Sequence, residues 1–399
     1  MNIILDGILN LSGLGIIIAT LVLTHVTIIS VTIYLHRHQS HHSLSLHPIA
    51  SHFFRFWLWL TTGTITKEWV AIHRKHHAKC ETAEDPHSPK ILGLKKLLLQ
   101  GYELYRAEAV KPETLDKYGN GTPNDWLERN LYSRFPLIGL ATMLIVDLLS
   151  FGIIGITVFA IQMLWIPFWA AGVINGIGHY FGYRNFETTD ASTNIMPWGL
   201  LIGGEELHNN HHAYPSSAKL SNKWWEFDLG WSYIRMLSFM GLAKIKKIAP
   251  KVYSKTDKQR VDMDTVRALA RHRFHIIKIY GRKVIRPVIR QECLRASQSY
   301  KLLLLRARKL LTREDIKQDK KAHELISQVL ETSQTIATVY QFKQQLKDLW
   351  SNSKQNQGKR IERMQKWCVD AEKTGIAVLQ DFAQYIRGYT EVKNMHFNF

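Results

Sequence analysis

Long hydrophobic runs occur at two places in the first half of the chain, and both are long enough to cross a lipid bilayer. The first covers residues 13–35 and holds one histidine and no formal charge. At about 1.5 Å per helical residue, a helix of this length spans a hydrocarbon core of about 30 Å. The second covers residues 136–181, with Asp147 as its single charged residue. We expect two crossings there, at about 136–158 and 160–181, joined near the glycines at 152–155.

A shorter apolar and aromatic segment lies between these runs, at residues 49–66. It contains His52 and Arg55 and runs into Lys67 and Glu68. Aromatic side chains favour the boundary between lipid headgroups and hydrocarbon. This segment therefore either crosses the membrane or lies in its interface.

Beyond residue 250 the pattern changes to helical stretches rich in Lys, Arg, Gln and Leu, interrupted by Pro287 and by the polar run 351–358. Residues 67–134 and 182–249 mix charges with Pro and Gly, which indicates water-facing segments. The pattern predicts an all-α protein in two parts. Residues 1–250 form a membrane-embedded domain with a cytoplasmic helical cap, and residues 251–399 form a basic helical C-terminal extension.

Charge is divided unevenly between these two parts. The chain has 52 Lys and Arg against 33 Asp and Glu, a formal net charge of +19, whereas residues 1–240 hold 18 of each kind. The whole basic excess therefore belongs to residues 241–399. A basic helix is more often a solvated or headgroup-binding surface than a nucleic-acid reader, and no nucleic-acid motif is visible. Nucleic acid is not an expected partner of residues 1–250, and contact of the extension with a polyanion stays an alternative.

The three cysteines, Cys80, Cys293 and Cys368, are far apart and form no CxxC pair. This favours reduced thiols in a cytoplasmic compartment over a disulfide framework. The first ten residues lack the basic region and cleavage site of a signal peptide, so we expect the first hydrophobic run to be retained.

Histidines carry the strongest chemical signal. Fifteen of the nineteen lie in residues 1–212, and most belong to three clusters: HRHQSHH at 36–42, HRKHH at 73–77 and HNNHH at 208–212. In a helical H-x-x-H-H, the imidazoles at i, i+3 and i+4 leave one face and can converge on a point. His36 and His41 can do likewise across a helix end. His179 adds an imidazole at the end of the predicted hairpin, one turn after Asn175.

The number of imidazoles indicates more than one metal ion. Neutral imidazole is a good ligand for zinc, copper, iron and nickel, and a structural zinc takes at most four ligands. Eight cluster histidines and His179 are too many for one ion. Two ions sharing about nine ligands account for them, and iron is the metal that activates O₂ with nitrogen ligands. Solvated histidines, a zinc-only site and, for His179 alone, a satisfied core histidine are the alternatives. The remaining histidines of this half are interpreted as structural or surface residues: His25, His38, His42, His47, His52 and His87.

The clusters also predict topology, because side chains that meet at one metal site lie on one face of the membrane. The first cluster follows the first span and the second follows residues 49–66, so that segment is expected to be interfacial. The hairpin at 136–181 then returns the chain to the same face for the third cluster. The basic extension follows on that side, which the positive-inside rule makes cytoplasmic.

The clusters resemble those of the integral-membrane acyl desaturases of the stearoyl-CoA Δ9 type, particularly the bacterial members, over about residues 13–245. The matching motifs are HRHQSH at 36–41, HRKHH at 73–77, NGIGH at 175–179 and GEELHNNHHAYP at 204–215, followed by WWEFDLGW at 224–231. The resemblance implies that Asn175 acts through a water molecule and that no catalytic residue exists beyond the metal centre. It implies two irons held by nine histidines: His36, His41, His73, His76, His77, His179, His208, His211 and His212.

The resemblance further implies an O₂-dependent oxidoreductase that puts a cis double bond, near Δ9, into a saturated C16–C18 acyl chain carried by CoA or phospholipid. Its electrons come from a separate ferredoxin or cytochrome with its reductase, because no haem domain or cysteine-ligated cluster pattern is present. Its expected location is a bacterial inner membrane, with the catalytic side in the cytoplasm. Hydroxylation of a lipid or alkane is the alternative reaction. The candidates for the wall of an acyl tunnel, with core or interfacial packing as the alternative, are Trp69, Trp198, Trp224 and Trp225.

Overall fold

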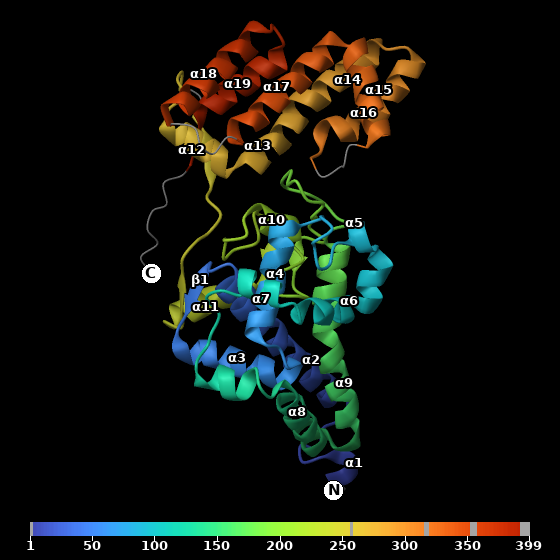
Figure 1. Cartoon of the computed structure of the whole chain (residues 1–399), viewed down its shortest axis with the longest axis vertical. Coiled ribbons are helices and arrows are strands. Elements are labelled where there is room, and N and C mark those ends of the chain that lie inside the picture. Colours follow the sequence, from blue (N-terminus) through green and yellow to red (C-terminus); the bar gives the residue numbers. More distant parts are fainter. Residues whose placement is uncertain (1–2, 256–257, 315–318, 352–356, 392–399) are drawn as a thin grey trace. The chain divides into compact units, whose positions relative to one another are not determined.

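The structure is a computed structural model that describes residues 3–255, 258–314, 319–351 and 357–391 (Figure 1). The chain forms two compact units. The first consists of Met1–Arg184 and Ser192–Ala249, and the second of Asn185–Ala191 and Pro250–Phe399. Helices dominate both units and the strands are two or three residues long, which confirms the predicted all-α class.

The first unit begins with a short helix and a long apolar one and continues through the histidine-bearing segments. Its helices, including the π- and 3₁₀-helical segments labelled η, are α1 (Ile3–Asp6), α2 (Gly13–Ser30), η1 (Val31–Ser40), α3 (Pro48–Thr62), α4 (Thr66–Lys79), α5 (Pro89–Leu92), α6 (Leu94–Ala109), α7 (Pro112–Tyr118), η2 (Glu128–Tyr132), α8 (Pro136–Phe151), η3 (Gly152–Ile154), α9 (Gly155–Ile166), η4 (Pro167–Ile177), α10 (His208–Ala213) and α11 (Leu229–Phe239). Two small sheets complete it. Strand β1 (Leu44–Leu46) pairs antiparallel with β4 (Ala243–Ile245), and β2 (Trp198–Gly199) pairs parallel with β3 (Phe227–Asp228).

Two helical stretches, Gly13–Ser40 and Pro136–Ile177, are long and apolar enough to cross a membrane. The second turns back on itself at Gly152, whose φ of 67° is a backbone conformation that glycine adopts at little cost. The arms α8 and α9 pack together beside this turn, where Gly155 meets the Asp147 carbonyl. Aliphatic side chains project from both stretches without protein cover, as lipid contact requires; they include Leu14, Ile17, Leu21, Leu137, Ile145, Leu149 and Leu164.

The aromatic segment between the spans forms α3, which begins at Pro48 and ends at Gly63 in a left-handed cap. Its 15 residues reach about 22 Å, less than a bilayer core of about 30 Å. Ile49, Phe53 and Phe56 are exposed, whereas Arg55 is buried and paired with Asp125 at 2.7 Å. A short helix with one apolar face and a neutralised cation suits an interfacial position.

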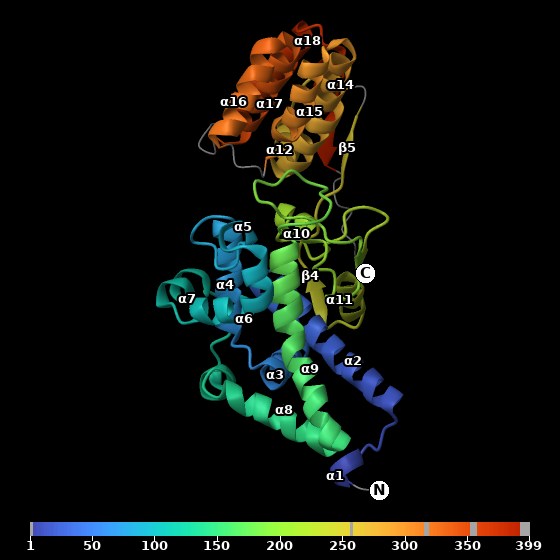
Figure 2. The same ribbon diagram turned by 90° about the vertical axis from the view of Figure 1, so that its right-hand side faces the viewer.

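Helix α1 packs against the turn between α8 and α9, as Figures 1 and 2 show. The backbone amide of Ile8 donates to the Leu149 carbonyl at 2.8 Å, and that of Leu9 donates to the Ser150 carbonyl at 3.1 Å. This turn is the end of the hairpin remote from the histidine-bearing helices α4 and α10 (Figure 1). Residues 3–12 therefore lie at the opposite end of the spans from the histidines.

The second unit is a helical body whose core is one cluster of buried side chains, including Leu269, Tyr280, Leu304, Trp367 and Phe382. A short antiparallel pair, β5 (Val252–Ser254) with β6 (Tyr389–Glu391), joins its first and last described segments. Its helices are α12 (Met263–Arg271), α13 (Arg273–Tyr280), η5 (Gly281–Ile285), α14 (Arg286–Arg295), α15 (Gln298–Thr312), α16 (Lys320–Thr332), α17 (Gln334–Ser351), α18 (Gln357–Lys373) and α19 (Ala377–Gly388).

Candidate metal centre

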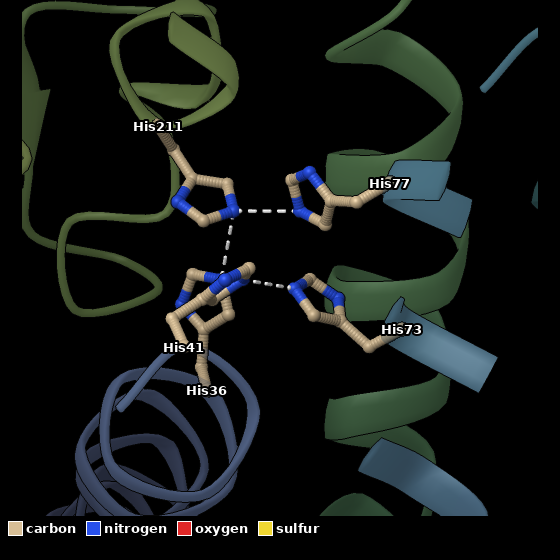
Figure 3. Close-up of side chains that lie close together, drawn as sticks. All are labelled: His36, His41, His73, His77 and His211. Carbon is tan, nitrogen blue, oxygen red and sulfur yellow. Dashed lines mark hydrogen bonds between the residues drawn. The ribbon is translucent and has the colours of Figure 1, made fainter. Parts of the chain in front are cut away.

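Five imidazoles from three separate segments converge in the first unit (Figure 3). One nitrogen from each lies within 4.8 Å of one nitrogen from every other member of the group. The closest approaches are 2.8 Å between Nε2 of His41 and His73, 2.8 Å between Nε2 of His77 and His211, and 3.0 Å between Nε2 of His36 and His211. We call this set group A: His36, His41, His73, His77 and His211.

Local structure explains how the first cluster supplies two members of group A. Residues 31–40 form η1, a π-helix, and the backbone amide of His41 donates to the His36 carbonyl five residues earlier at 3.1 Å. In this wider turn, residues five apart lie close to one face. His73 and His77 lie one turn apart on α4, so the two helices present facing pairs of imidazoles (Figure 3).

In a second set of four buried imidazoles, one nitrogen of each ring likewise lies within 4.8 Å of one nitrogen of every other ring. We call this set group B: His76, His179, His208 and His212. Nε2 of His179 lies 2.9 Å from Nε2 of His208. The two groups adjoin each other, because the rings of His77 and His212 stack with centroids 4.4 Å apart. The nine histidines of the two groups are the nine that the sequence motifs single out.

The other candidates lie outside both groups. His38 is hydrogen-bonded through Nδ1 to the Leu44 carbonyl at 3.2 Å, and His42 accepts through Nε2 from Arg74 at 3.0 Å. His87 is buried against the His76 ring, with centroids 4.3 Å apart. Asn175 is half-buried on η4, one turn before His179.

Carboxylates hold the outer nitrogen of several imidazoles, a feature that the sequence motifs did not reveal. Nδ1 of His36 lies 2.8 Å from Glu205, Nδ1 of His76 lies 2.9 Å from Asp85, and Nδ1 of His179 lies 3.3 Å from Glu81. Because a carboxylate accepts, Nδ1–H must donate, which leaves the Nε2 lone pair of each ring directed into its group. The acidic residues close to the second and third clusters are the sequence signal for this role.

Burial keeps four imidazoles of group A neutral. Burial, and next the charge of neighbouring imidazoles, holds the pKa of His41, His73 and His77 well below its usual value, and the same two causes lower the pKa of His211. Neutral imidazole is the form that donates a lone pair to a metal ion. Nine imidazole donors in two adjacent groups, three of them with the outer nitrogen held by a carboxylate, fit two nitrogen-ligated metal ions.

Buried ion pairs fix the segments that carry the ligands. Arg37, 1% exposed, bridges the Asp228 carboxylate at 2.9 Å and the carbonyls of Gly203 and Ala218, which ties the first cluster to the segments around the third. Glu226 accepts from the Asn210 side chain at 2.8 Å and so anchors α10. The acidic residues of the WWEFDLGW motif therefore support the site.

The four tryptophans that were candidates for an acyl tunnel differ in position. Trp69 stacks on His73, with centroids 5.0 Å apart and ring planes at 15°. The other three are exposed: Trp198 by 62%, Trp224 by 95% and Trp225 by 40%. The tunnel interpretation is wrong for Trp224, since a side chain so exposed walls no enclosed space, whereas an interfacial position suits all three.

Comparison with known proteins gives two family matches. A fatty acid desaturase model matches residues 12–238, more than half of the chain and all nine histidines of groups A and B. A transposase model matches residues 269–397, which belong to the second unit.

Three curated relatives show the range of similar enzymes. Delta-9 acyl-lipid desaturase 1 of Arabidopsis thaliana is 28% identical over 235 residues, covering 55% of this chain and 71% of the relative. The sn-1 stearoyl-lipid 9-desaturase of Synechocystis sp. is 32% identical over 229 residues, covering 56% and 68%. Acyl-CoA 5-desaturase AL21 of Anemone leveillei is 30% identical over 229 residues, covering 56% and 69%.

Proposed function

This chain belongs to the fatty acid desaturase family, as the histidine motifs predicted, and we propose that it puts a cis double bond at or near Δ9 of a saturated C16–C18 acyl chain. The observation that supports this most strongly is the convergence of nine imidazoles in two adjacent groups. Two bound irons would supply the oxidising power, with O₂ as co-substrate. Removing two hydrogens from the chain while O₂ is reduced to two waters requires two electrons and two protons from outside.

The residues of this chain hold and orient the centre. The Nε2 atoms of groups A and B are the proposed ligands, with Asn175 acting through a water molecule. Glu205 and Asp85 hold His36 and His76 in the tautomer that ligates. Trp69 covers one face of His73 and excludes water from that side of group A.

The proposed topology places the histidines on the cytoplasmic face of a bacterial inner membrane. Two apolar stretches lead from this face to the opposite end of the spans, where α1 packs against the hairpin turn. The basic residues after position 240 make the histidine-bearing side cytoplasmic by the positive-inside rule. The electron donor is proposed to be a separate ferredoxin or cytochrome that approaches from that side.

The acyl carrier and the double-bond position are tested together. The chain is expressed in a host that lacks its own desaturase, and the position of any new double bond is determined by mass spectrometry. Membranes from these cells then receive labelled stearoyl-CoA in one assay and labelled phosphatidylcholine or phosphatidylethanolamine in another, with the double variant His73→Ala/His77→Ala as the control.

We expect a Δ9 product from one carrier and none from the double variant. Relatives are named for acyl-lipid and for acyl-CoA substrates. The labelled substrate that is converted to product faster therefore identifies the carrier. A hydroxylated product, or no unsaturated product from iron-loaded protein with a working reductant, would contradict the proposal.

A further inference from the structure

A short segment that lies in sequence between the two stretches of the first unit belongs to the second unit. Residues Asn185–Ala191, which we call the 185–191 loop, lie in sequence between His179 and α10, yet they pack with residues after 250. The backbone amide of Glu187 donates to the Phe274 carbonyl at 3.1 Å, and Lys278 Nζ donates to the Glu187 carboxylate at 2.8 Å. Phe186 is 2% exposed, with its ring 5.9 Å from that of His275. The loop is thus held by a buried carboxylate, a backbone bond and an aromatic side chain.

The two ends of the 185–191 loop are tied together inside the first unit. Arg184 donates to the Ser192 carbonyl at 2.9 Å, and Tyr183 and Asn194 exchange backbone hydrogen bonds of 2.9 and 2.7 Å. The Thr193 amide donates to the Gly178 carbonyl at 2.6 Å. These contacts form a narrow base from which the chain leaves the first unit and to which it returns.

This base carries two of the three segments that supply group B. Gly178 is the neighbour of His179 in sequence. On the returning side, the side-chain Oδ1 of Asn194 accepts from the Asn210 backbone amide at 3.1 Å, and the side-chain Nδ2 of Asn194 donates to Asn210 Oδ1 at 3.1 Å. Asn210 lies on α10 between His208 and His212. A shift of the base therefore moves three of the four imidazoles of group B.

Group A depends much less on this base. Four of its five members come from η1, its C-terminal end and α4, and only His211 comes from α10. An untethered loop samples many conformations, and ordering it costs about 1–2 kcal/mol per residue. Because the second unit already holds the tip of the loop, the assembly of group B does not carry this entropic cost of ordering it.

We propose that the second unit is a positioning domain for one half of the metal centre, with the Glu187–Lys278 pair as its principal anchor on the 185–191 loop. This rests on the proposed function only in requiring that groups A and B bind metal. Glu187 and Lys278 are positioning residues, since they act through the base of the loop on His179 and α10.

The test measures metal binding by the purified full-length chain. The variants are Glu187→Lys, Lys278→Glu and the double exchange Glu187→Lys/Lys278→Glu, and Arg286→Glu is the matched control because it reverses an exposed charge in the same unit. Metal per chain is determined by elemental analysis, and Fe²⁺ affinity by anaerobic titration. Thermal unfolding reports folding, and the milder Glu187→Gln replaces any reversal that fails to fold.

We expect each single reversal to lower the metal content from about two to about one per chain, with about 10–100-fold weaker binding at the affected site. The double exchange should recover most of the second metal, and Arg286→Glu should keep both. Wild-type binding in both single variants, or equal loss of both metals, would overturn the proposal. Two metals bound by wild-type protein without desaturated product would instead contradict the proposed function and leave this result standing.

Discussion

His41 and His42 are neighbours in sequence whose imidazoles have different partners. His41 Nε2 lies 2.8 Å from His73 Nε2 inside group A, whereas His42 Nε2 accepts from Arg74 outside it. We expect His41→Ala to lose one iron and to lower desaturation at least about 100-fold, since it removes a ligand. His42→Ala should keep both irons and most of its activity. Activity assays with metal analysis compare the two, and an active His41→Ala beside an inactive His42→Ala would show that the ligand register is wrong.

Glu205 acts on the centre through one imidazole. Its carboxylate accepts from His36 Nδ1 at 2.8 Å and from Thr32 at 2.5 Å. Glu205→Gln keeps the shape and removes the charge, so we expect iron affinity at one site to fall about 10–100-fold. Iron titration measures this change. The same substitution at the half-buried Glu68, which pairs with Arg106, should leave affinity unchanged. An unaffected Glu205→Gln would contradict the role of the carboxylate.

The two H-x-x-H-H motifs predicted that six histidines converge, because residues at i, i+3 and i+4 share one helical face. They did not predict the carboxylates, since Glu205 and His36 are 169 positions apart and meet only in the folded chain. Tryptophans near the third cluster were candidates for an acyl tunnel, yet Glu226 and Asp228 are the residues of that motif that point inward. Aromatic character alone does not distinguish a buried side chain from one at a membrane interface.

Helices α3 and α8 pack closely at Gly139. A Cβ at this position would lie 2.3 Å from the Trp59 carbonyl oxygen, whereas one at Gly13 would meet nothing within 4 Å. We expect Gly139→Ala to destabilise the protein by about 1–3 kcal/mol, because a backbone carbonyl cannot move aside. Gly13→Ala should be neutral or stabilise by up to about 1 kcal/mol. Thermal unfolding in detergent measures both, and equal midpoints would contradict this packing.

Hydropathy indicated the long elements but not their local form. The hairpin turns at Gly152, within the predicted glycine region, because the apolar run is too long for one crossing and glycine permits the reversal. The π-helix around the first cluster was not predicted, since its wider turn depends on tertiary contacts such as the Arg37 bridge. Sequence spacing indicated only that His36 and His41 could converge across a helix end.

The second unit contains a pH-sensitive histidine that belongs to neither histidine group. Burial, and next Arg271, lowers the pKa of His272 from 6.5 to about 4. Arg271 binds Glu391 at 2.7 Å and so neutralises a carboxylate that lies 3.7 Å from His272 Nε2. Because the unfolded chain binds this proton first, stability rises with pH between about 4 and 6.5 and is lost as the pH falls through that window.

We expect acidification from pH 7 to 4 to cost the second unit about 3 kcal/mol through His272. Hydrogen exchange of α12 and α13, corrected for intrinsic rates, measures this loss in the full-length chain. His272→Gln should flatten the dependence, whereas the same change at the exposed His323 should not. An unchanged pH profile in His272→Gln would contradict the buried, neutral state of this histidine.

The division into units was only partly accessible to sequence reasoning. The change to basic helical composition near residue 250 coincides with the start of the main segment of the second unit at Pro250. The 185–191 loop has no such signal, because its membership depends on contacts with α13 made across about ninety residues of chain. A single boundary in the sequence cannot describe a unit that consists of two separate stretches of chain.

The claim that nine histidines form two adjacent metal sites is tested most directly by the metal content of purified wild-type protein. Expression with ample iron limits mis-loading, since nitrogen-rich sites also bind zinc tightly. We expect about two irons per chain, with five imidazoles ligating one and four ligating the other. A single stoichiometric metal ion in iron-replete protein, above all one zinc, would contradict it.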